Sequence, residues 1–307
     1  MSRILVTGAS GFVGRALVAD LAAAGHTVRA AMRRPADVFP RSVEVVAVSD
    51  LTRPVEWPPL LRSMETVVHL AGIAHAGAGV AEEAYDRVNR LATSELALAA
   101  KAIGVRHLVF VSSVRAQCGP SSDTVLRETD AAMPTDAYGR SKLAAEEVVR
   151  AANVPFTILR PTLIYGSGVK GNFARLIALA RQPWPLPFGL CRNRRSLLAR
   201  ENLIGAIHAA LALPAGGETY IVADPTALTL AEIVGALREG FGRSPGLLPV
   251  PPALLGLAAA TAGRSEEWRR LSGASVADCG KLMQAGWKPA LQTRAGLIAL
   301  ARSEAAR

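Results

Sequence analysis

The chain has 307 residues, of which 50% are hydrophobic and 20% are charged. These values are close to those of ordinary globular proteins and exclude a disordered chain, a collagen-like repeat and a coiled coil. The 35 lysines and arginines exceed the 25 aspartates and glutamates, which gives a net charge of +10. Because the basic residues are scattered and aromatic residues amount to only 5%, the charge indicates a solvated surface and phosphate-bearing small ligands rather than nucleic acid.

The cysteines indicate a reducing compartment. Cys118, Cys191 and Cys279 are odd in number and widely spaced, and they form no CxxC pair. We therefore expect neither a disulfide framework nor a metal site. The first residues lead directly into a strand-like segment, without the basic and apolar regions of a secretory signal. A cytoplasmic location is expected.

The longest apolar stretch, Gly246–Gly263, is interrupted by three prolines. Too few uninterrupted residues remain to span a bilayer, which takes about 20. The stretch predicts a loop followed by a short buried helix, and no membrane span.

Short apolar runs alternate with helix-length amphipathic stretches in the first half of the chain, which is typical of a parallel sheet covered on both faces. Strands are expected at Ile4–Thr7, Val28–Met32, Val43–Val48, Thr66–Leu70, Leu108–Ser112 and Phe156–Leu159. Helices are expected at about Phe12–Ala24, Ala84–Ile103 and Ala137–Ala152. The predicted fold class is therefore α/β, a Rossmann-type doubly wound parallel sheet with a smaller C-terminal substrate-binding lobe.

Loops rich in proline, glycine and arginine become frequent after about residue 161. We expect residues 1–165 to form the Rossmann core and residues 166–307 to form mainly the second lobe, with about 196–225 returning to the core. Such a lobe is expected over the carboxyl ends of the strands, where open α/β sheets bind ligands. Its expected elements are helices near Phe173–Arg181, Leu197–Leu213, Leu230–Phe241 and Thr293–Ala301, and a strand at Thr219–Val222.

The segment TGASGFVG, residues 7–14, follows the first strand directly and opens a helix. This is the context that a dinucleotide-binding glycine motif requires. Gly8 permits the tight turn, Gly11 allows the backbone to approach a pyrophosphate, and Gly14 allows the helix to pack closely on the strand. Because the helix N-terminus then faces the phosphates, we expect a dinucleotide site here.

The residues after the second strand bear on the choice between NAD and NADP. An NAD site usually has an acidic residue there for the ribose 2′-hydroxyl, whereas this chain has Arg33 and Arg34. Two guanidinium groups suit a 2′-phosphate, which physically favours NADP without excluding NAD. Asp50, just past the third strand, is a candidate partner for the adenine amino group.

A catalytic group is expected around the end of the fifth strand. Tyr138 and Lys142 are four residues apart, so they share one face of a helix. An ammonium group near a phenol lowers the phenol's pKa from about 10 toward a value useful for proton transfer. Ser113 is then placed to hold a substrate oxygen while Tyr138 exchanges its proton and the cofactor exchanges a hydride.

These motifs resemble the extended short-chain dehydrogenases/reductases, the NAD-dependent epimerase/dehydratase group. The resemblance rests on TGASGFVG, on HLAG at 69–72, on VSS at 111–113 and on YGRSK at 138–142. The second half is similar to bacterial UDP-hexose 4-epimerases and UDP-4-keto-hexose reductases of surface-polysaccharide synthesis, in segments 164–173, 185–189, 193–197 and 286–289.

The resemblance implies that Ser113, Tyr138 and Lys142 are the catalytic residues. It also implies substrate contacts from Ser113, from Asn172 and Phe173 on the uridine side and from Arg195 at the diphosphate. Arg269 and Arg270 are candidates for a second diphosphate clamp, and Arg270 is included among the expected substrate contacts. The implied cofactor contacts are Gly8, Ser10, Gly11, Phe12, Val13, Gly14, Arg33, Arg34, Asp50, Leu51, Leu70, Ala71, Gly72, Tyr138, Lys142 and Pro161. A homodimer formed through a four-helix bundle is implied as well.

One departure from the family pattern narrows the chemistry. Sugar-nucleotide dehydratases of this family carry an Asp-Glu pair after the catalytic hydroxyl residue, whereas Val114 and Arg115 follow Ser113 here. Elimination of water is therefore not expected. The segment 115–119 also lacks the aromatic residue that usually precedes the glycine in epimerases, which bears on the choice of sugar.

Three functions remain open on sequence alone. The first is epimerisation at C4 of a UDP-hexose of the UDP-glucose or UDP-N-acetylglucosamine type through a 4-keto intermediate. The second is NAD(P)H-dependent reduction of a UDP-4-keto-6-deoxyhexose, which the two arginines after the second strand favour. The third is a dinucleotide-binding sensor or scaffold without activity, although such proteins tend to lose the tyrosine or the lysine.

Overall fold

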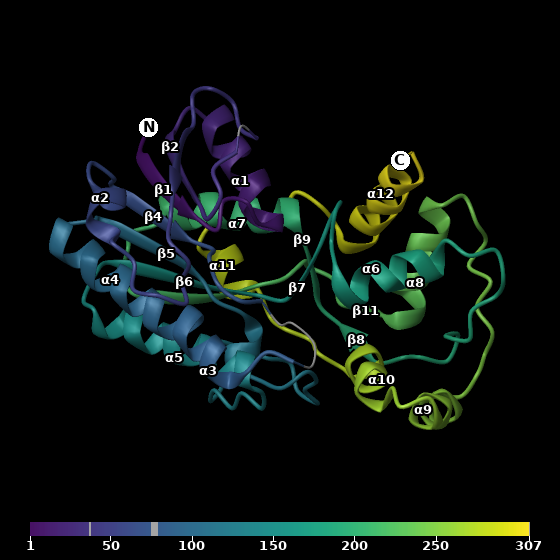
Figure 1. Cartoon of the computed structure of the whole chain (residues 1–307). Helices are drawn as coiled ribbons and strands as arrows, with labels where there is room; N and C mark the ends of the chain where they lie inside the picture. Colours follow the sequence, from purple (N-terminus) through teal and green to yellow (C-terminus); the bar gives the residue numbers. More distant parts are fainter. Residues whose placement is uncertain (37, 75–78, 307) are drawn as a thin grey trace. The chain divides into compact units, whose positions relative to one another are not determined.

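The computed structural model describes residues 1–36, 38–74 and 79–306, which divide into two compact units (Figure 1). Unit 1 comprises Met1–Gly119, Glu128–Pro161 and Ala206–Ile221, and unit 2 comprises Pro120–Arg127, Thr162–Gly205 and Val222–Arg307. Apart from Pro120–Arg127, which belongs to unit 2, the first part of the chain stays in unit 1 up to Pro161, whereas the sequence predicted a boundary at residue 165. The segment that returns to unit 1 is 206–221, which is shorter than the expected 196–225.

Unit 1 is built on a seven-stranded sheet in the order β10-β6-β5-β4-β1-β2-β3. The pairs from β6 through β5, β4, β1 and β2 to β3 are all parallel, and Leu5 at the centre is in register with Arg29 and Val67. The strands are β1 (Arg3–Thr7), β2 (Thr27–Met32), β3 (Glu44–Ala47), β4 (Thr66–His69), β5 (His107–Val111), β6 (Phe156–Pro161) and β10 (Glu218–Val222). All seven strands expected from the sequence are therefore confirmed within two residues.

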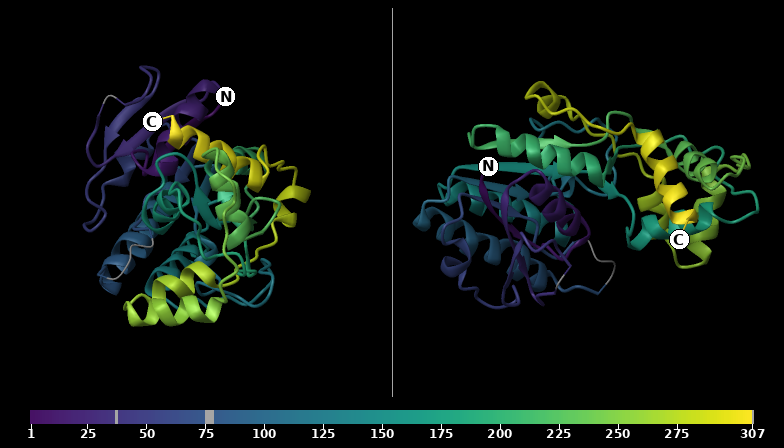
Figure 2. Two further views of the ribbon diagram at one scale, coloured as in Figure 1. Left: turned by 90° about the vertical axis from the view of Figure 1, so that its right-hand side faces the viewer. Right: turned by 90° about the horizontal axis from the view of Figure 1, so that it is seen from above.

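The helices of unit 1 bury apolar side chains against this sheet. One cluster joins Trp57, Leu96 and Val149 from three helices to Leu5 and Phe110 of the strands. Figures 1 and 2 show α4 and α5 side by side along the sheet. The elements are α1 (Phe12–Ala23), α2 (Trp57–Leu61), α3 (Glu82–Tyr85), the π-helix η1 (Asp86–Leu91), α4 (Ala92–Ile103), the 3₁₀ turn η2 (Val114–Ala116) and α5 (Ala137–Ala151).

Unit 2 has two small sheets and a helical core. β7 (Leu163–Tyr165) pairs parallel with β9 (Leu197–Ala199), and β8 (Arg194–Arg195) pairs antiparallel with β11 (Leu228–Thr229). Its helices are α6 (Gly171–Ala180), α8 (Leu230–Gly240), α9 (Pro252–Thr261), α10 (Ser265–Ser272), α11 (Gly280–Gln284) and α12 (Thr293–Ala305), while α7 (Arg200–Ala212) runs from unit 2 into unit 1. Figure 2 shows α8 and α12 packed together.

Two expectations for the second half are wrong. The helix expected at 197–213 begins only at Arg200, because Leu197–Ala199 forms β9 with backbone pairing to β7. The helix expected to be buried after the proline-rich loop is α9, which has no buried residue. Within the described residues no helix is long and apolar enough to cross a membrane.

Candidate functional site

The glycine turn after β1 has the geometry of a phosphate-binding loop. Gly8 has φ +68°, and a Cβ there would lie 2.8 Å from the backbone nitrogen of Ala71. A Cβ at Gly14 would lie 2.2 Å from the carbonyl oxygen of Gly8, so α1 packs closely on the turn. Gly11 is the N-cap of α1 and offers no capping side chain. Because no side chain caps the start of α1, the turn and this helix start fit the pyrophosphate of a dinucleotide.

The predicted cofactor residues at β2 and β3 lie close together. Arg33 and Arg34 follow β2 and are exposed. Asp50 accepts a hydrogen bond from the backbone of Thr52, and this bond, together with the positive charge of Arg33, holds the pKa of Asp50 below its usual value. Leu51 is buried in the core of unit 1. Arg33 thus takes the place where an acidic residue would bind a ribose hydroxyl.

A buried histidine supports the glycine turn through hydrogen bonds. His69 at the end of β4 contacts Thr7 through Nδ1, at 2.7 Å, and Thr93 of α4 through Nε2, at 3.0 Å. Thr7 Oγ1 in turn accepts the N–H of Ala71 at 3.2 Å. Burial and the nearby charge of Lys142 lower the pKa of His69 to about 3, so the imidazole stays neutral. This network ties β1, β4 and α4 together beneath the glycine turn.

The π-helix η1 positions a second bracing residue. Asn89 is 1% exposed and bonds both backbone groups of Ile73, at 2.8 and 3.1 Å. It also donates to Ser141 of α5 at 3.0 Å. A Cβ at Gly72 would lie 2.8 Å from Asn89 Oδ1, so a side chain at position 72 would displace the amide group of Asn89. Single-turn π-helices are often found at functional sites, and here one joins the loop after β4 to the helix that carries Tyr138.

Ser113 and Tyr138 meet at the carboxyl end of β5. Their side chains are hydrogen-bonded, and the ring of Tyr85 lies edge-on to Tyr138 with a centroid distance of 6.0 Å. A Cβ at Gly139 would lie 2.3 Å from the carbonyl oxygen of Arg115, so η2 packs directly on the first turn of α5. The structure therefore brings together the serine and tyrosine that the sequence predicted as catalytic.

Lys142 lies one turn after Tyr138 on α5. Its Nζ donates to the carbonyl oxygen of Val111 at 2.9 Å and lies 4.4 Å from the centroid of the Phe110 ring. Burial lowers the pKa of Lys142 from 10.5 to about 8, and the charge of Glu146 opposes that change. Lys142 is thus a buried cation at the end of β5, held by a carbonyl and an aromatic face.

The sequence predicted that Lys142 lowers the pKa of Tyr138, and this prediction is wrong. Burial raises the pKa of Tyr138 above its ordinary value, whereas the hydrogen bond with Ser113 and the charge of Arg115 act in the opposite direction. Desolvation disfavours the phenolate, and it outweighs both. The guanidinium that acts on the phenol is that of Arg115, which forms an ion pair with Asp136, the N-cap residue of α5.

A buried ion pair joins the strands to α5 and was not expected from the sequence. Glu146, with a fully buried side chain, accepts bonds from Arg160 of β6 at 2.7 and 2.9 Å and from Ser112 at 2.7 Å. Arg160 also donates to Gln117 at 3.0 Å. Glu146 lies one turn after Lys142, and Ser112 precedes Ser113, so this network fixes the two elements that carry the predicted catalytic residues. No pattern in the sequence indicates that an arginine on a strand will pair with a glutamate on a helix.

Replacing Lys142 by methionine is expected to change how stability depends on pH. Between pH 8 and 10.5 the unfolded chain holds a proton on Lys142 that the folded chain lacks, so the wild type gains stability as the pH rises. The gain is about 3 kcal/mol over this interval. Urea unfolding from pH 7.5 to 10.5 measures it, and the variant should lack that rise. Parallel pH curves for the two proteins would contradict the assignment of the lowered pKa.

Within unit 2, the residues before and in β8 alternate between two faces. Asn193 and Arg195 line a small cavity of about 30 Å³ together with Leu163, Phe173, Leu176, Leu197, Leu230, Ile233 and Leu271. Arg195 donates to the carbonyl oxygen of Gly273 at 2.9 Å. Two of the predicted substrate residues, Phe173 and Arg195, thus line this cavity.

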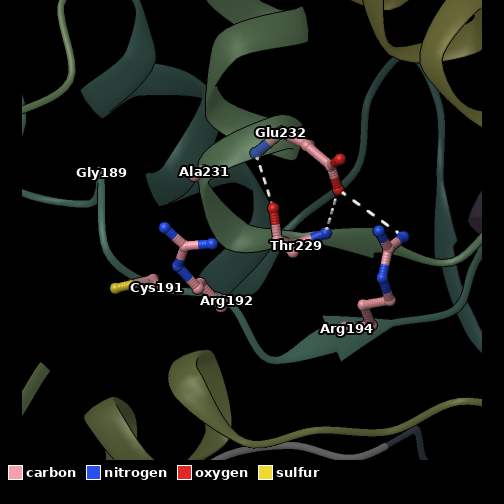
Figure 3. Close-up of a pocket in the computed structure, with 7 residues that line it drawn as sticks. All are labelled: Gly189, Cys191, Arg192, Arg194, Thr229, Ala231 and Glu232. Carbon is pink, nitrogen blue, oxygen red and sulfur yellow. Dashed lines mark hydrogen bonds and ion pairs between the residues drawn. The ribbon is translucent and has the colours of Figure 1, made fainter.

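The opposite face of this segment lines a shallower and larger hollow of about 450 Å³ (Figure 3). Arg192 and Arg194 lie there, beside the N-terminus of α8, where Thr229 and Glu232 form a capping box. Arg194 donates to the carbonyl oxygen of Ala227 at 2.7 Å and pairs with Glu232 at 3.9 Å. Arg194 is therefore engaged in holding β8 to α8.

The remaining predicted substrate residues differ in their surroundings. Asn172 is the exposed second residue of α6, whereas the neighbouring Phe173 is 6% exposed and packs against Tyr165 at a ring-centroid distance of 5.9 Å. Arg270 lies on α10 and forms an ion pair with Glu266 at 3.7 Å. No group of three or more metal-ligating side chains is found in residues 1–36, 38–74 and 79–306.

The chain belongs to the NAD dependent epimerase/dehydratase family, whose model matches residues 4–223. It is 32% identical to a UDP-glucose 4-epimerase of Vibrio cholerae over 93% of this chain and 90% of that protein. It is 28% identical to the N-acetyl-alpha-D-glucosaminyl-diphospho-ditrans,octacis-undecaprenol 4-epimerase of Escherichia coli O157:H7, over 82% of this chain and 77% of that protein. The structure resembles that of MoeE5 in complex with UDP-glucuronic acid and NAD, with a TM-score of 0.77 and 25% identity over 98% and 99% of the two chains.

Proposed function

We propose that this protein is an NAD(P)-dependent UDP-hexose 4-epimerase. The observation that carries the proposal is the contact between Ser113 and Tyr138 at the end of β5, with Lys142 one turn further along α5. The similarity over nine tenths of a UDP-glucose 4-epimerase supports the same activity. We also propose that the protein is cytoplasmic and that it forms a homodimer.

The residues of unit 1 perform the proton transfer. The glycine turn of residues 7–14 would hold the pyrophosphate of NAD(P), which would supply a hydride acceptor and then a hydride donor. Tyr138 accepts the proton of the sugar 4-hydroxyl and returns it to the 4-keto oxygen, while Ser113 holds that oxygen by a hydrogen bond. Return of the hydride to the opposite face of C4 would invert the configuration there with no net oxidation. The hydrogen bond with Ser113 and the charge of Arg115 favour the phenolate of Tyr138, against the effect of burial.

Val114 and Arg115 oppose dehydration. The acid and base that eliminate water in the family's dehydratases are replaced by an apolar residue and by a guanidinium that pairs with Asp136. An arginine cannot act as a base at neutral pH. Chemistry at C4 is therefore the activity that the site retains.

The identity of the retained dinucleotide tests the proposal. The protein is purified without added cofactor and denatured, and the released nucleotide is identified by mass spectrometry. Near-stoichiometric NAD or NADP is expected, since an epimerase keeps its cofactor between half-reactions. An empty site that binds added NADPH, with reduction of a UDP-4-keto sugar, would instead establish the reductase, the alternative that Arg33 and Arg34 favour.

Arg195 is expected to bind the diphosphate of the substrate. Arg195→Ala should raise the KM for a UDP-hexose by roughly 10- to 100-fold, because the lost charge-assisted hydrogen bond is worth about 1.5–3 kcal/mol. Arg194→Ala is the matched control, since Arg194 lies on the other face of β8, and its KM should stay within about twofold. Steady-state kinetics of both variants measures this, and equal effects on KM would contradict the assignment.

A further inference from the structure

α9 is an apolar helix with no buried side chain. Leu254 and Leu257 are 57% and 64% exposed and lie one turn apart on the same side of the helix. The sequence from Leu247 to Gly263 contains no charged residue. Its one side-chain hydroxyl, that of Thr261, donates to the carbonyl oxygen of Ala258 within the helix. An uncovered surface of this kind marks an interaction site.

The helix is anchored on its other side. α9 and α10 lie side by side within unit 2 (Figures 1 and 2). Leu255 packs against the core of unit 2, and a Cβ at Gly256 would lie 3.1 Å from Nε1 of Trp268. α9 is therefore held by its packing and presents Leu254 and Leu257 outward.

Apolar side chains that precede α9 are exposed as well. Leu248 is 49% exposed and donates its N–H to the carbonyl oxygen of Leu186, at 2.8 Å. The strand-like loop that contains Leu186 also carries Trp184, which is 55% exposed. Tryptophan favours the boundary between water and lipid, and leucine favours the acyl chains next to it.

The acidic residues of α10 are paired with a larger number of arginines. Glu266 pairs with Arg269 and Arg270, and Glu267 pairs with Arg175 and Arg264. Four arginines thus surround two glutamates, which leaves a net charge of +2 beside the apolar helix. Three of the arginine side chains, Arg175, Arg264 and Arg269, are 63–68% exposed. Exposed ion pairs are weak, so these guanidinium groups are available to lipid phosphates.

We propose that α9 docks on an anionic membrane surface. Leu254 and Leu257 enter the boundary between headgroups and acyl chains, and the arginines of α10 contact lipid phosphates. A second copy of the chain is a less suitable partner, because a twofold contact through α9 would bring two positively charged clusters near one interface without an acidic surface to balance them. With ten residues α9 lies on the membrane rather than across it.

Vesicle sedimentation of the full-length protein tests this docking. Binding is measured to vesicles of phosphatidylcholine alone and to vesicles that contain about one third phosphatidylglycerol. The partition coefficient is expected to be about tenfold or more higher with the anionic vesicles, and to fall with added salt. Leu254→Gln/Leu257→Gln should lower it about tenfold or more, whereas Met133→Gln, an exposed residue of unit 1, should not change it.

Other results would overturn the proposal. One is an equal affinity of the wild type for the two kinds of vesicle. The others are absence of binding to either kind, and unchanged binding of the double leucine variant. Sedimentation equilibrium without lipid tests a fourth contrary result. In that result the wild type is a dimer that does not bind vesicles, and Leu254→Gln/Leu257→Gln converts it to a monomer. Arg264→Gln/Arg269→Gln provides a second variant, expected to lose the preference for anionic lipid while its circular dichroism stays unchanged.

Discussion

Replacing Tyr138 by phenylalanine is expected to lower kcat for UDP-hexose epimerisation by about 10²- to 10⁴-fold. The phenol is the group that accepts and returns the proton of the 4-hydroxyl, and Ser113 alone does not supply a base of suitable pKa. The change removes one oxygen from a side chain whose ring packs against Tyr85. Initial rates with a UDP-hexose at saturating concentration measure the effect.

The variant must still bind the dinucleotide and remain folded for this result to concern chemistry. Its content of released dinucleotide and its melting temperature are therefore compared with those of the wild type, and both should be nearly unchanged. Full activity of Tyr138→Phe would show that the phenol is not the proton carrier.

Replacing Arg160 by methionine is expected to lower the free energy of unfolding by about 3–5 kcal/mol. The side chains of Arg160 and Glu146 are 6% and 0% exposed, so the change leaves a carboxylate in the interior without its main partner. Removal of one member of a buried ion pair costs far more than the pair contributes, because the other charge cannot regain its hydration. Urea unfolding of both proteins measures the difference.

The chain provides a matched control for this prediction. Arg150 pairs with the same carboxylate of Glu146, at 3.0 Å, but its own side chain is 38% exposed. Arg150→Met is therefore expected to cost less than about 1 kcal/mol. Equal losses for Arg150→Met and Arg160→Met would show that burial does not govern this pair.

The sheet and the glycine turn could be predicted because their signals are local. Each strand is a short run of apolar residues bounded by turn residues, and a parallel sheet covered on both faces needs nothing else. Gly8 and Gly14 follow β1 at the spacing that a tight turn and a closely packed helix require. The pair Tyr138 and Lys142 was recognisable because a helix places residues four apart on one face.

The supports of the site depend on contacts that sequence spacing does not encode. Glu146 and Arg160 come from a helix and a strand, and each resembles a surface charge until the fold buries them together. The direction of the pKa change of Tyr138 depends on burial, which a pattern of tyrosine and lysine does not reveal. The exposure of α9 was missed for a related reason, since an apolar helix is usually a buried one.

The most direct test of a C4 epimerase is to incubate the purified protein with UDP-glucose and without added cofactor, and to follow the anomeric proton signals by NMR. The proposed function predicts UDP-galactose in a ratio that becomes constant with time, without net formation of reduced dinucleotide. UDP-N-acetylglucosamine is tested in the same way, since the sugar's second position is not determined by the residues above. Absence of interconversion for both sugars, by a protein that contains bound dinucleotide, would contradict the proposed function.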